Sequence, residues 1–385
     1  MPIAVDRDYT VRTLAELVRI NSINPSIAQD GPGEAEVAAY VADTLGGLGL
    51  EMAVYEPQPG RTTAVGTLKG AGGGKSLMFN GHADTVGVEG MPDPFSAAIH
   101  EGKLFGRGAY DMKGSLAACI AAAKALVDAG VRLRGDLVIA AVADEEYGSL
   151  GTTDLIEHCK VDAAIVAEPT ALNVCLAHKG YLWIDVETTG RAAHGSRFTE
   201  GIDANMRMGR FLAGLDKLEQ KLRARPGHPL VGPPSLHAAT VRGGSGLSTY
   251  AANCILQIER RTVPGETEAQ VLAELQAIAD RLAAQDPTFK ATIESFFVRE
   301  PFEVSREARI VKVVEQAARD VLGRQPVFVG DTPWMDAALL AAAGIETVVI
   351  GPRGGGAHAD EEWVDLQTVV DLAAILAHTA IDYCG

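Results

Sequence analysis

An uninterrupted apolar run that ends in three acids constrains the fold more than any other feature of the chain. Residues 137–143 carry no polar side chain, and Asp144, Glu145 and Glu146 follow at once. Such a run is typical of a strand buried on both faces of a sheet. Adjacent acids at the end of a buried strand repel one another, and a nearby cation removes that conflict. The segment therefore predicts a covered sheet with a cation site at one edge.

The neighbouring segments show the rhythm of strands and helices that such a sheet needs. Residues 77–81 and 162–167 are further short apolar runs, and the Ala-rich residues 112–129 have helical length and end at Gly130. Alternation of this kind favours an α/β fold, in which helices flank a mixed central sheet on both faces. The rhythm returns after residue 298 and ends in an expected helix at residues 366–381.

Between these two parts lies a segment of different character. Its strands alternate polar and apolar residues, and the order strand, helix, strand, strand, helix, strand predicts an inserted α+β domain. The expected elements lie at residues 181–188, 203–223, 235–242, 254–262, 266–284 and 291–298. We therefore expect one catalytic domain built from residues 1–178 and 298–385, with residues 179–297 inserted into it.

Composition excludes several classes of protein. The chain has 34 Lys and Arg against 50 Asp and Glu, a formal charge of −16, so it has no general attraction for nucleic acid or anionic membranes. Its apolar stretches fall short of the roughly 18 residues of a membrane span, and residues 1–12 lack the apolar core of a signal peptide. We therefore expect a cytoplasmic protein with no nucleic-acid or membrane partner.

Any metal ligands are expected to be histidines and carboxylates, because the five cysteines are too scattered for a disulfide framework or a thiolate zinc site. His82 and Asp84 follow the strand predicted at residues 77–80. They lie two residues apart, so they point the same way in an extended chain, and Asp84 can orient the His82 ring. Glu168 follows the apolar residues 163–167 in the same manner.

Two further candidates are ambiguous when each is taken alone. Asp111 either caps the helix predicted from Met112 or bridges two metal ions. His358 follows the glycine-rich residues 351–356, where an ordinary surface histidine is the simpler interpretation. Ligands of open α/β sheets bind beyond the carboxyl ends of the strands. Two histidines and several acids at successive strand ends fit that arrangement and together predict one metal site.

Five motifs occur in a fixed order along nearly the whole chain. They are His-x-Asp at 82–84, Gly-Arg-Gly-x-x-Asp-x-Lys-Gly at 106–114, Asp-Glu-Glu-x-Gly at 144–148, Glu-Pro-Thr at 168–170 and a glycine-rich segment ending in Ala-His at 357–358. This order resembles the co-catalytic dinuclear metallopeptidase family that contains acetylornithine deacetylase, succinyl-diaminopimelate desuccinylase, aminoacylase and carboxypeptidase G.

The resemblance implies a hydrolase with two divalent metal ions. In that family pattern His82 and Glu168 would complete one metal site, Glu146 and His358 would complete the other, and Asp111 would bridge both. Zinc is the expected metal, with cobalt or manganese as alternatives that the same ligands accept.

The resemblance also assigns the catalytic roles. Glu145 would be the general base that takes a proton from the attacking water, and Asp84 would support the His82 ring. Because Glu145 and Glu146 are adjacent, their side chains diverge, so one can bind metal while the other faces the substrate.

The inserted domain resembles the lid and dimerisation domain of the same family, which implies a homodimer. His194, in Gly-Arg-Ala-Ala-His-Gly-Ser at 190–196, would reach the partner's active site and bind the developing oxyanion, unless it is an ordinary histidine at a strand end. Asn253 and Arg261 would hold the substrate carboxylate, with Arg260 as the alternative arginine. The role of Trp334, in a loop or in core packing, stays open.

The expected activity is hydrolysis of the amide bond of an N-acyl amino acid, a small-molecule reaction of amino-acid metabolism like that of acetylornithine deacetylase or succinyl-diaminopimelate desuccinylase. The alternatives are a metallo-carboxypeptidase or dipeptidase acting on small peptides, and a non-catalytic binding relative. A nucleotide-binding function is disfavoured because the glycine-rich residues 70–76 lack the spacing of a phosphate-binding loop.

Overall fold

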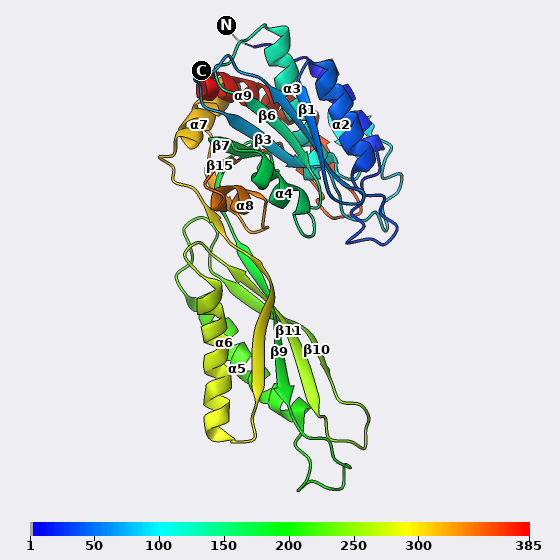
Figure 1. Cartoon of the computed structure of the whole chain (residues 1–385), viewed down its shortest axis with the longest axis vertical. Coiled ribbons are helices and arrows are strands. Elements are labelled where there is room, and N and C mark those ends of the chain that lie inside the picture. Colours follow the sequence, from blue (N-terminus) through cyan, green and yellow to red (C-terminus); the bar gives the residue numbers. More distant parts are fainter. Residues whose placement is uncertain (1–2) are drawn as a thin grey trace. The chain divides into compact units, whose positions relative to one another are not determined.

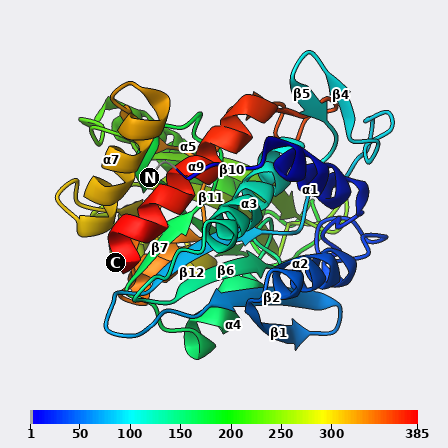
Figure 2. The same cartoon turned by 90° about the horizontal axis from the view of Figure 1, so that it is seen from above.

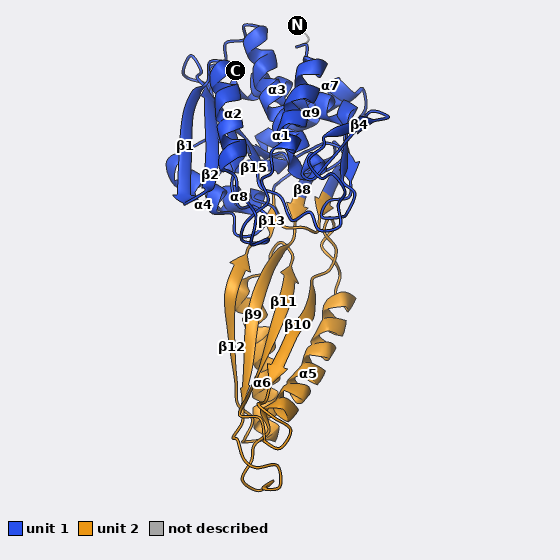
Figure 3. Cartoon of the chain, turned by 90° about the vertical axis from the view of Figure 1, so that its right-hand side faces the viewer, with its two compact units in different colours: residues 1–176, 304–329, 335–385 blue, residues 177–303, 330–334 orange. Residues whose placement is uncertain are grey.

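The computed structural model describes residues 3–385, which form two compact units (Figure 1 and Figure 3). The first unit contains the chain up to Leu176, Val304–Val329 and Met335–Gly385, and the second contains Ala177–Glu303 and Gly330–Trp334. The sequence placed the two main borders after residues 178 and 297. The second border lies later in the structure because strand β12 (Ala291–Arg299) continues past residue 297.

A mixed sheet forms the centre of the first unit, and the predicted α/β class is confirmed. Its strands in the first unit run in the order β1, β2, β6, β3, β7, β15 and β8, with β14 beside β8. Strands β6, β3, β7 and β15 are parallel neighbours, whereas β1 and β2 are antiparallel. The strands are β1 (Glu51–Gln58), β2 (Arg61–Leu68), β3 (Leu77–His82), β6 (Leu137–Val142), β7 (Ala163–Val166), β8 (Val174–His178), β14 (Phe328–Asp331) and β15 (Glu346–Val349). The short strand β13 (Phe302–Glu303) is part of the second unit.

Helices cover both faces of this sheet. Strands β3, β6 and β7 are buried along their whole length, as their apolar runs predicted. Helices α1, α3 and α9 lie together on one face and α4 lies on the other (Figure 2). The helices are α1 (Arg7–Arg19), α2 (Ala35–Gly47), α3 (Gly114–Asp128), α4 (Leu150–His158), α7 (Arg309–Leu322), α8 (Ala337–Ala342) and α9 (Leu366–Cys384). No helix within residues 3–385 combines the length and apolar character needed to cross a membrane.

A second, smaller sheet of the first unit has no counterpart in the sequence predictions. Its strands run in the order β16, β17, β5 and β4. They are β4 (Ala98–His100), β5 (Lys103–Phe105), β16 (Gly354–Gly355) and β17 (Trp363–Asp365). Pairing of β5 with β17 brings the segment around residue 108 together with the segment around residue 360, which are about 250 residues apart.

The second unit is a four-stranded antiparallel sheet with helices α5 and α6 on one face (Figure 3). Alternate residues of β9, among them Leu182, Ile184 and Val186, are buried in the core that these helices complete. The order strand, helix, strand, strand, helix, strand is the one that the sequence predicts. The elements are β9 (Gly180–Thr189), α5 (Ala204–Ala224), β10 (Ser235–Gly243), β11 (Asn253–Thr262), α6 (Glu268–Gln285) and β12 (Ala291–Arg299).

Candidate metal centre

Three neighbouring parallel strands deliver polar residues to one edge of the central sheet. His82 is the last residue of β3, which pairs with β6 on one side and β7 on the other. Glu145 and Glu146 follow β6, and Glu168 follows β7. The register therefore brings these side chains together, and His82 Nε2 lies 3.6 Å from Glu168 Oε1.

Asp111 lies between the two predicted histidines. It belongs to a π-helical turn, Ala109–Lys113, that precedes α3. Asp111 Oδ1 is 3.0 Å from His82 Nε2, and Asp111 Oδ2 is 3.4 Å from His358 Nε2. His358 Nε2 is in turn 3.0 Å from Glu146 Oε2. The carboxylate thus faces two imidazoles at once.

Two overlapping sets of side chains have ligand atoms within 4.8 Å of one another. One set is His82, Asp111 and Glu146, and the other is His82, Glu145 and Glu168. Glu146 Oε1 is buried and has no hydrogen-bond partner among residues 3–385. Imidazole nitrogens and carboxylate oxygens with an orphaned buried oxygen are a donor set that fits divalent cations.

The pKa values show the conflict that a cation would relieve. Burial raises the pKa of the Glu145 carboxyl well above its ordinary value, and the charge of Glu168 raises it further. Burial also raises the pKa of Glu146, with Asp111 as the next cause. Hydrogen bonds to Asp111 and Glu146 raise the pKa of His358 to about 10. Burial and neighbouring like charges therefore disfavour the ionised form of these carboxylates, and a bound cation would favour it.

Asp84 makes different contacts from those that the sequence predicts. His82 Nδ1 is 2.9 Å from the backbone carbonyl oxygen of Asp84, while the Asp84 carboxylate is 3.7 Å from this nitrogen. That carboxylate instead accepts hydrogen bonds from the backbone N–H groups of Glu145 and Glu146, at 3.1 and 3.2 Å. The backbone carbonyl of Asp84 therefore orients the His82 ring. Its side chain holds residues 145 and 146, because the loop after β6 directs their N–H groups toward Asp84.

Glu362 is a residue of this site that the sequence analysis missed. Its carboxylate accepts hydrogen bonds from the backbone N–H groups of Tyr110 and Asp111, at 2.9 and 3.0 Å, and from Gly108. Arg107 Nη1 donates to it at 2.6 Å. Glu362 thereby holds the turn that presents Asp111. The sequence shows three acids at 360–362, and nothing local distinguishes the last of them.

The predicted residues of the second unit lie at two opposite ends of its sheet. Asn253 and Arg261 are eight residues apart on β11, which corresponds to about 27 Å along an antiparallel strand. His194 is exposed, forms an isolated bridge with Thr249 and therefore lies near the Asn253 end. One copy of this unit therefore cannot bring both Asn253 and Arg261 to the same small substrate.

The structure separates the two candidate arginines. Arg260 is 1% exposed and its Nη2 donates to Glu266 at 2.7 Å, so it lies on the helix side of the sheet. Arg261 lies on the other face, over the ring of Tyr181 at 4.9 Å, and donates to Glu259. Trp334 meets the same Tyr181 ring edge-on and donates its Nε1–H to the backbone oxygen of Glu300. Trp334 therefore belongs to the open face of this sheet.

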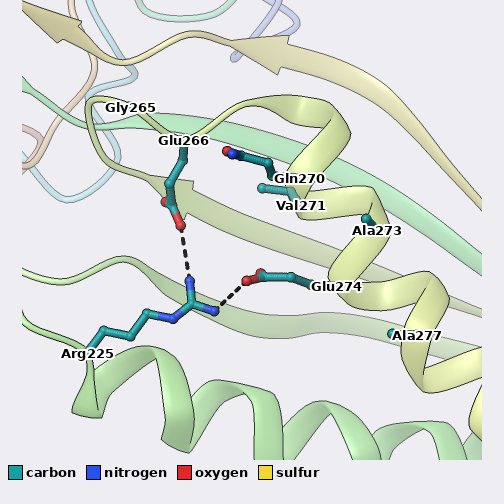
Figure 4. Close-up of a pocket in the computed structure, with 8 residues that line it drawn as sticks. All are labelled: Arg225, Gly265, Glu266, Gln270, Val271, Ala273, Glu274 and Ala277. Carbon is teal, nitrogen blue, oxygen red and sulfur yellow. Dashed lines mark hydrogen bonds and ion pairs between the residues drawn. The ribbon is translucent and has the colours of Figure 1, made fainter.

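A pocket of about 650 Å³ lies on the helix side of the second unit, away from the residues predicted to bind substrate (Figure 4). Arg225, after α5, bridges Glu266 at 3.5 Å and Glu274 of α6 at 2.5 Å. These ion pairs join the end of one helix to the start of the other. The charges in the wall of the pocket thus have partners within the unit.

Comparison with known proteins identifies the family. The model of peptidase family M20/M25/M40 matches residues 78–382. The chain belongs to this family. Members that resemble it include N-formyl-4-amino-5-aminomethyl-2-methylpyrimidine deformylase of Bacillus subtilis, 29% identical over 91% of this chain and 89% of that protein. Acetylornithine deacetylase of Myxococcus xanthus is 28% identical over 97% of both chains.

Solved structures of other proteins share this fold. Aminopeptidase PepT from Bacillus cereus superposes with a TM-score of 0.80 at 19% identity and covers 99% of this chain and 100% of its own. A dinuclear metal-binding peptidase of the M20 family from Bacillus subtilis has a TM-score of 0.78 at 15% identity and covers 98% of both chains. The predicted fold is confirmed, and so is the prediction of a hydrolase that cleaves amide bonds.

Proposed function

We propose that this protein uses two divalent metal ions to remove the acyl group from an N-acyl amino acid. The observation that carries the proposal is the position of Asp111, whose two oxygens face His82 and His358. Each of these imidazoles also meets a second acid, Glu168 for His82 and Glu146 for His358. A carboxylate between two such pairs suits two cations that share one ligand.

We assign His82 and Glu168 to one metal ion, Glu146 and His358 to the other, and Asp111 to both. Zinc is our first choice, with cobalt and manganese as alternatives for the same donors. When bound, the two cations polarise the scissile carbonyl, stabilise the oxyanion and make water more acidic. The acids of the site then exchange protons for cations, which removes the repulsion between them.

Glu145 is proposed to be the general base. It lies within the second donor set, beside Glu168, and its backbone is held by Asp84. Its carboxylate takes a proton from the attacking water, whose oxygen forms a bond to the acyl carbon. The same group then gives that proton to the amine nitrogen as the carbon–nitrogen bond breaks.

A homodimer is part of this proposal. Arg261 is at one end of the second unit, whereas His194 and Asn253 are near the other end, about 27 Å away along β11. We propose that Arg261 binds the substrate carboxylate and that His194 binds the oxyanion. Two different copies of the chain would then supply Arg261 on the one hand and His194 with Asn253 on the other. The cytoplasmic location remains a proposal from the sequence.

The decisive experiment is amine release from a panel of N-formyl, N-acetyl, N-succinyl and longer N-acyl amino acids together with dipeptides. Enzyme stripped by a chelator is reloaded with zinc, cobalt or manganese before the assay. Metal-dependent cleavage of acyl amino acids supports the proposal and identifies the acyl group. Cleavage of dipeptides alone would favour the peptidase alternative. No cleavage by enzyme that holds two metals would favour a binding function.

A further inference from the structure

Five buried polar side chains next to the metal centre neither bind metal nor transfer protons in the reaction proposed above. They belong to the first unit and are each at most 4% exposed. The five are Asn24, Glu34, Arg61, Asp84 and Asp144, and we call them the Asp84 network. Glu34 and Asp144 share the Arg61 guanidinium, and the Asn24 amide links Asp144 to Asp84, so loss of Arg61 would leave two carboxylates buried without their cation.

Glu34 and Arg61 form the base of the network. Arg61 Nε and Nη2 donate to both oxygens of Glu34, the shortest contact being 2.6 Å. Arg61 Nη2 also donates to Asp144 Oδ1 at 2.8 Å, and Arg61 Nη1 donates to Ser26 Oγ at 3.0 Å. The planar guanidinium thus fixes the distance between Glu34 and Asp144.

Asp144 is where the chain turns after β6. Its backbone has φ of 68°, a left-handed conformation that is uncommon for residues other than glycine. Its N–H donates to Glu34 at 3.3 Å, and its carbonyl oxygen accepts from the N–H of Gly148 at 3.0 Å. Arg61 also binds the Asp144 side chain, so the N–H, the carbonyl and the side chain of this residue are all hydrogen-bonded. These contacts set the direction of the segment that follows.

Asn24 and Asp84 connect Asp144 to the backbone of Glu145 and Glu146. The Asn24 side-chain amide donates to Asp84 Oδ2 at 2.7 Å and to Asp144 Oδ1 at 3.0 Å, so one NH₂ group joins two carboxylates. Asp84 in turn accepts from the consecutive N–H groups of Glu145 and Glu146. The Asp84 carboxylate therefore binds the backbone N–H of the proposed base, Glu145, and that of the proposed ligand, Glu146. Its own position depends on the hydrogen bond from Asn24.

We propose that Asn24 and Arg61 are positioning residues that aim Glu145 at the substrate and Glu146 at its metal ion. This inference rests on the proposed function for the role of Glu145. Residues 24, 34 and 61 precede residues 78–382, the part that the family model matches, so that match carries no information about them. Their link to the site comes from the hydrogen bonds alone.

Two substitutions test the proposal in the full-length protein. Asn24→Ala removes the shared amide and leaves the Glu34–Arg61 pair intact, and Arg61→Lys keeps the charge but loses the planar fork. We expect the zinc affinity, measured by competition with a chelator, to fall about 10–100-fold, as for other residues that orient metal ligands. We expect kcat to fall by a similar factor with KM within about twofold, because neither residue is assigned to the substrate.

A core variant supplies the matched control. Ile375→Val in α9 is fully buried in the first unit and lies outside the network. It lowers the melting temperature by loss of packing alone, so zinc affinity and kcat should stay at the wild-type values. If Arg61→Lys does not fold, Asn24→Ala carries the test. The proposal would be overturned if the network variants had a lower melting temperature but, like Ile375→Val, kept the zinc affinity and kcat of the wild type.

The affinity measurement also separates this inference from the proposed function. A wild-type protein that binds two zinc ions but cleaves no acyl amino acid would refute the function, while weaker zinc binding by Asn24→Ala would still support the network. A wild-type protein that cleaves its substrate, with both variants unchanged in zinc affinity and in kcat, would refute the network and leave the function standing.

Discussion

Replacement of Glu145 with Gln tests the division between base and ligand directly. Glu145 lies in one donor set with His82 and Glu168, so its side chain is close enough to act in either role. As a general base it should contribute about 10²–10⁴-fold to kcat, and the amide cannot accept the proton. We therefore expect Glu145→Gln to lose that factor in kcat and to keep two metal ions per subunit.

The same substitution is expected to stabilise the metal-free protein in a pH-dependent manner. Burial raises the pKa of Glu145 well above its ordinary value of 4.5, and Glu168 adds to the rise. A carboxyl with a raised folded-state pKa destabilises the protein once the unfolded chain releases its proton, and the loss grows as pH rises toward the folded-state value. Each pKa unit between the folded and unfolded states corresponds to about 1.4 kcal/mol, so we expect the variant to gain at least about 1 kcal/mol at pH 8.

The assay is urea unfolding of chelator-treated wild type and variant at pH 4 and pH 8, with metal analysis and kcat on the reloaded enzymes. At pH 4 the carboxyl is mostly protonated in both the folded and the unfolded state, so little gain is expected there. A gain of equal size at both pH values would refute the electrostatic explanation. Loss of one metal ion from Glu145→Gln would show instead that this residue is a ligand.

Three further predictions concern other parts of the molecule. His194→Ala should lower kcat about 10²–10³-fold with an unchanged melting temperature, and His237→Ala, also exposed on the second unit, should leave kcat unchanged. Glu362→Ala leaves Arg107 buried without its partner, so urea unfolding should show a loss of about 3–5 kcal/mol; a loss below 1 kcal/mol would contradict the buried pair. Arg261→Lys should raise KM about tenfold or more with little change in kcat, and a change in kcat alone would exclude the carboxylate contact.

Regular elements with a strong pattern were predictable from the sequence. The apolar residues 137–143 predicted β6 to within one residue, and the Ala-rich residues 112–129 predicted α3, which begins at Gly114. The helix starts two residues later because Asp111 and its neighbours form the π-helical turn whose amides bind Glu362. The smaller sheet was missed, since strands of two or three residues are too short to show a period.

The amino-acid sequence alone determined which kinds of side chain lie at the edge of the central sheet. Strands β6 and β7 are apolar throughout, and β3 is apolar apart from Asn80 and His82. Burial of all three strands was therefore predictable, and the residues at their ends emerge at one edge of the sheet. Histidine and carboxylate donors directly after such strands are a local feature, readable without any tertiary contact. A metal site at this edge was predictable for this reason, whereas the hydrolase was predicted from the resemblance of the five motifs to a known family.

Only the tertiary structure decided what each carboxylate does. Asp84 holds the amides of Glu145 and Glu146, 61 and 62 residues further along the chain, and Glu362 holds the Asp111 turn from 251 residues away. Such hydrogen bonds depend on which loops come into contact once the sheet has packed. Neither a hydrophobic periodicity nor a motif predicts those contacts. Burial increases the contribution of these hydrogen bonds to stability, because a charge removed from water is costly unless it is paired.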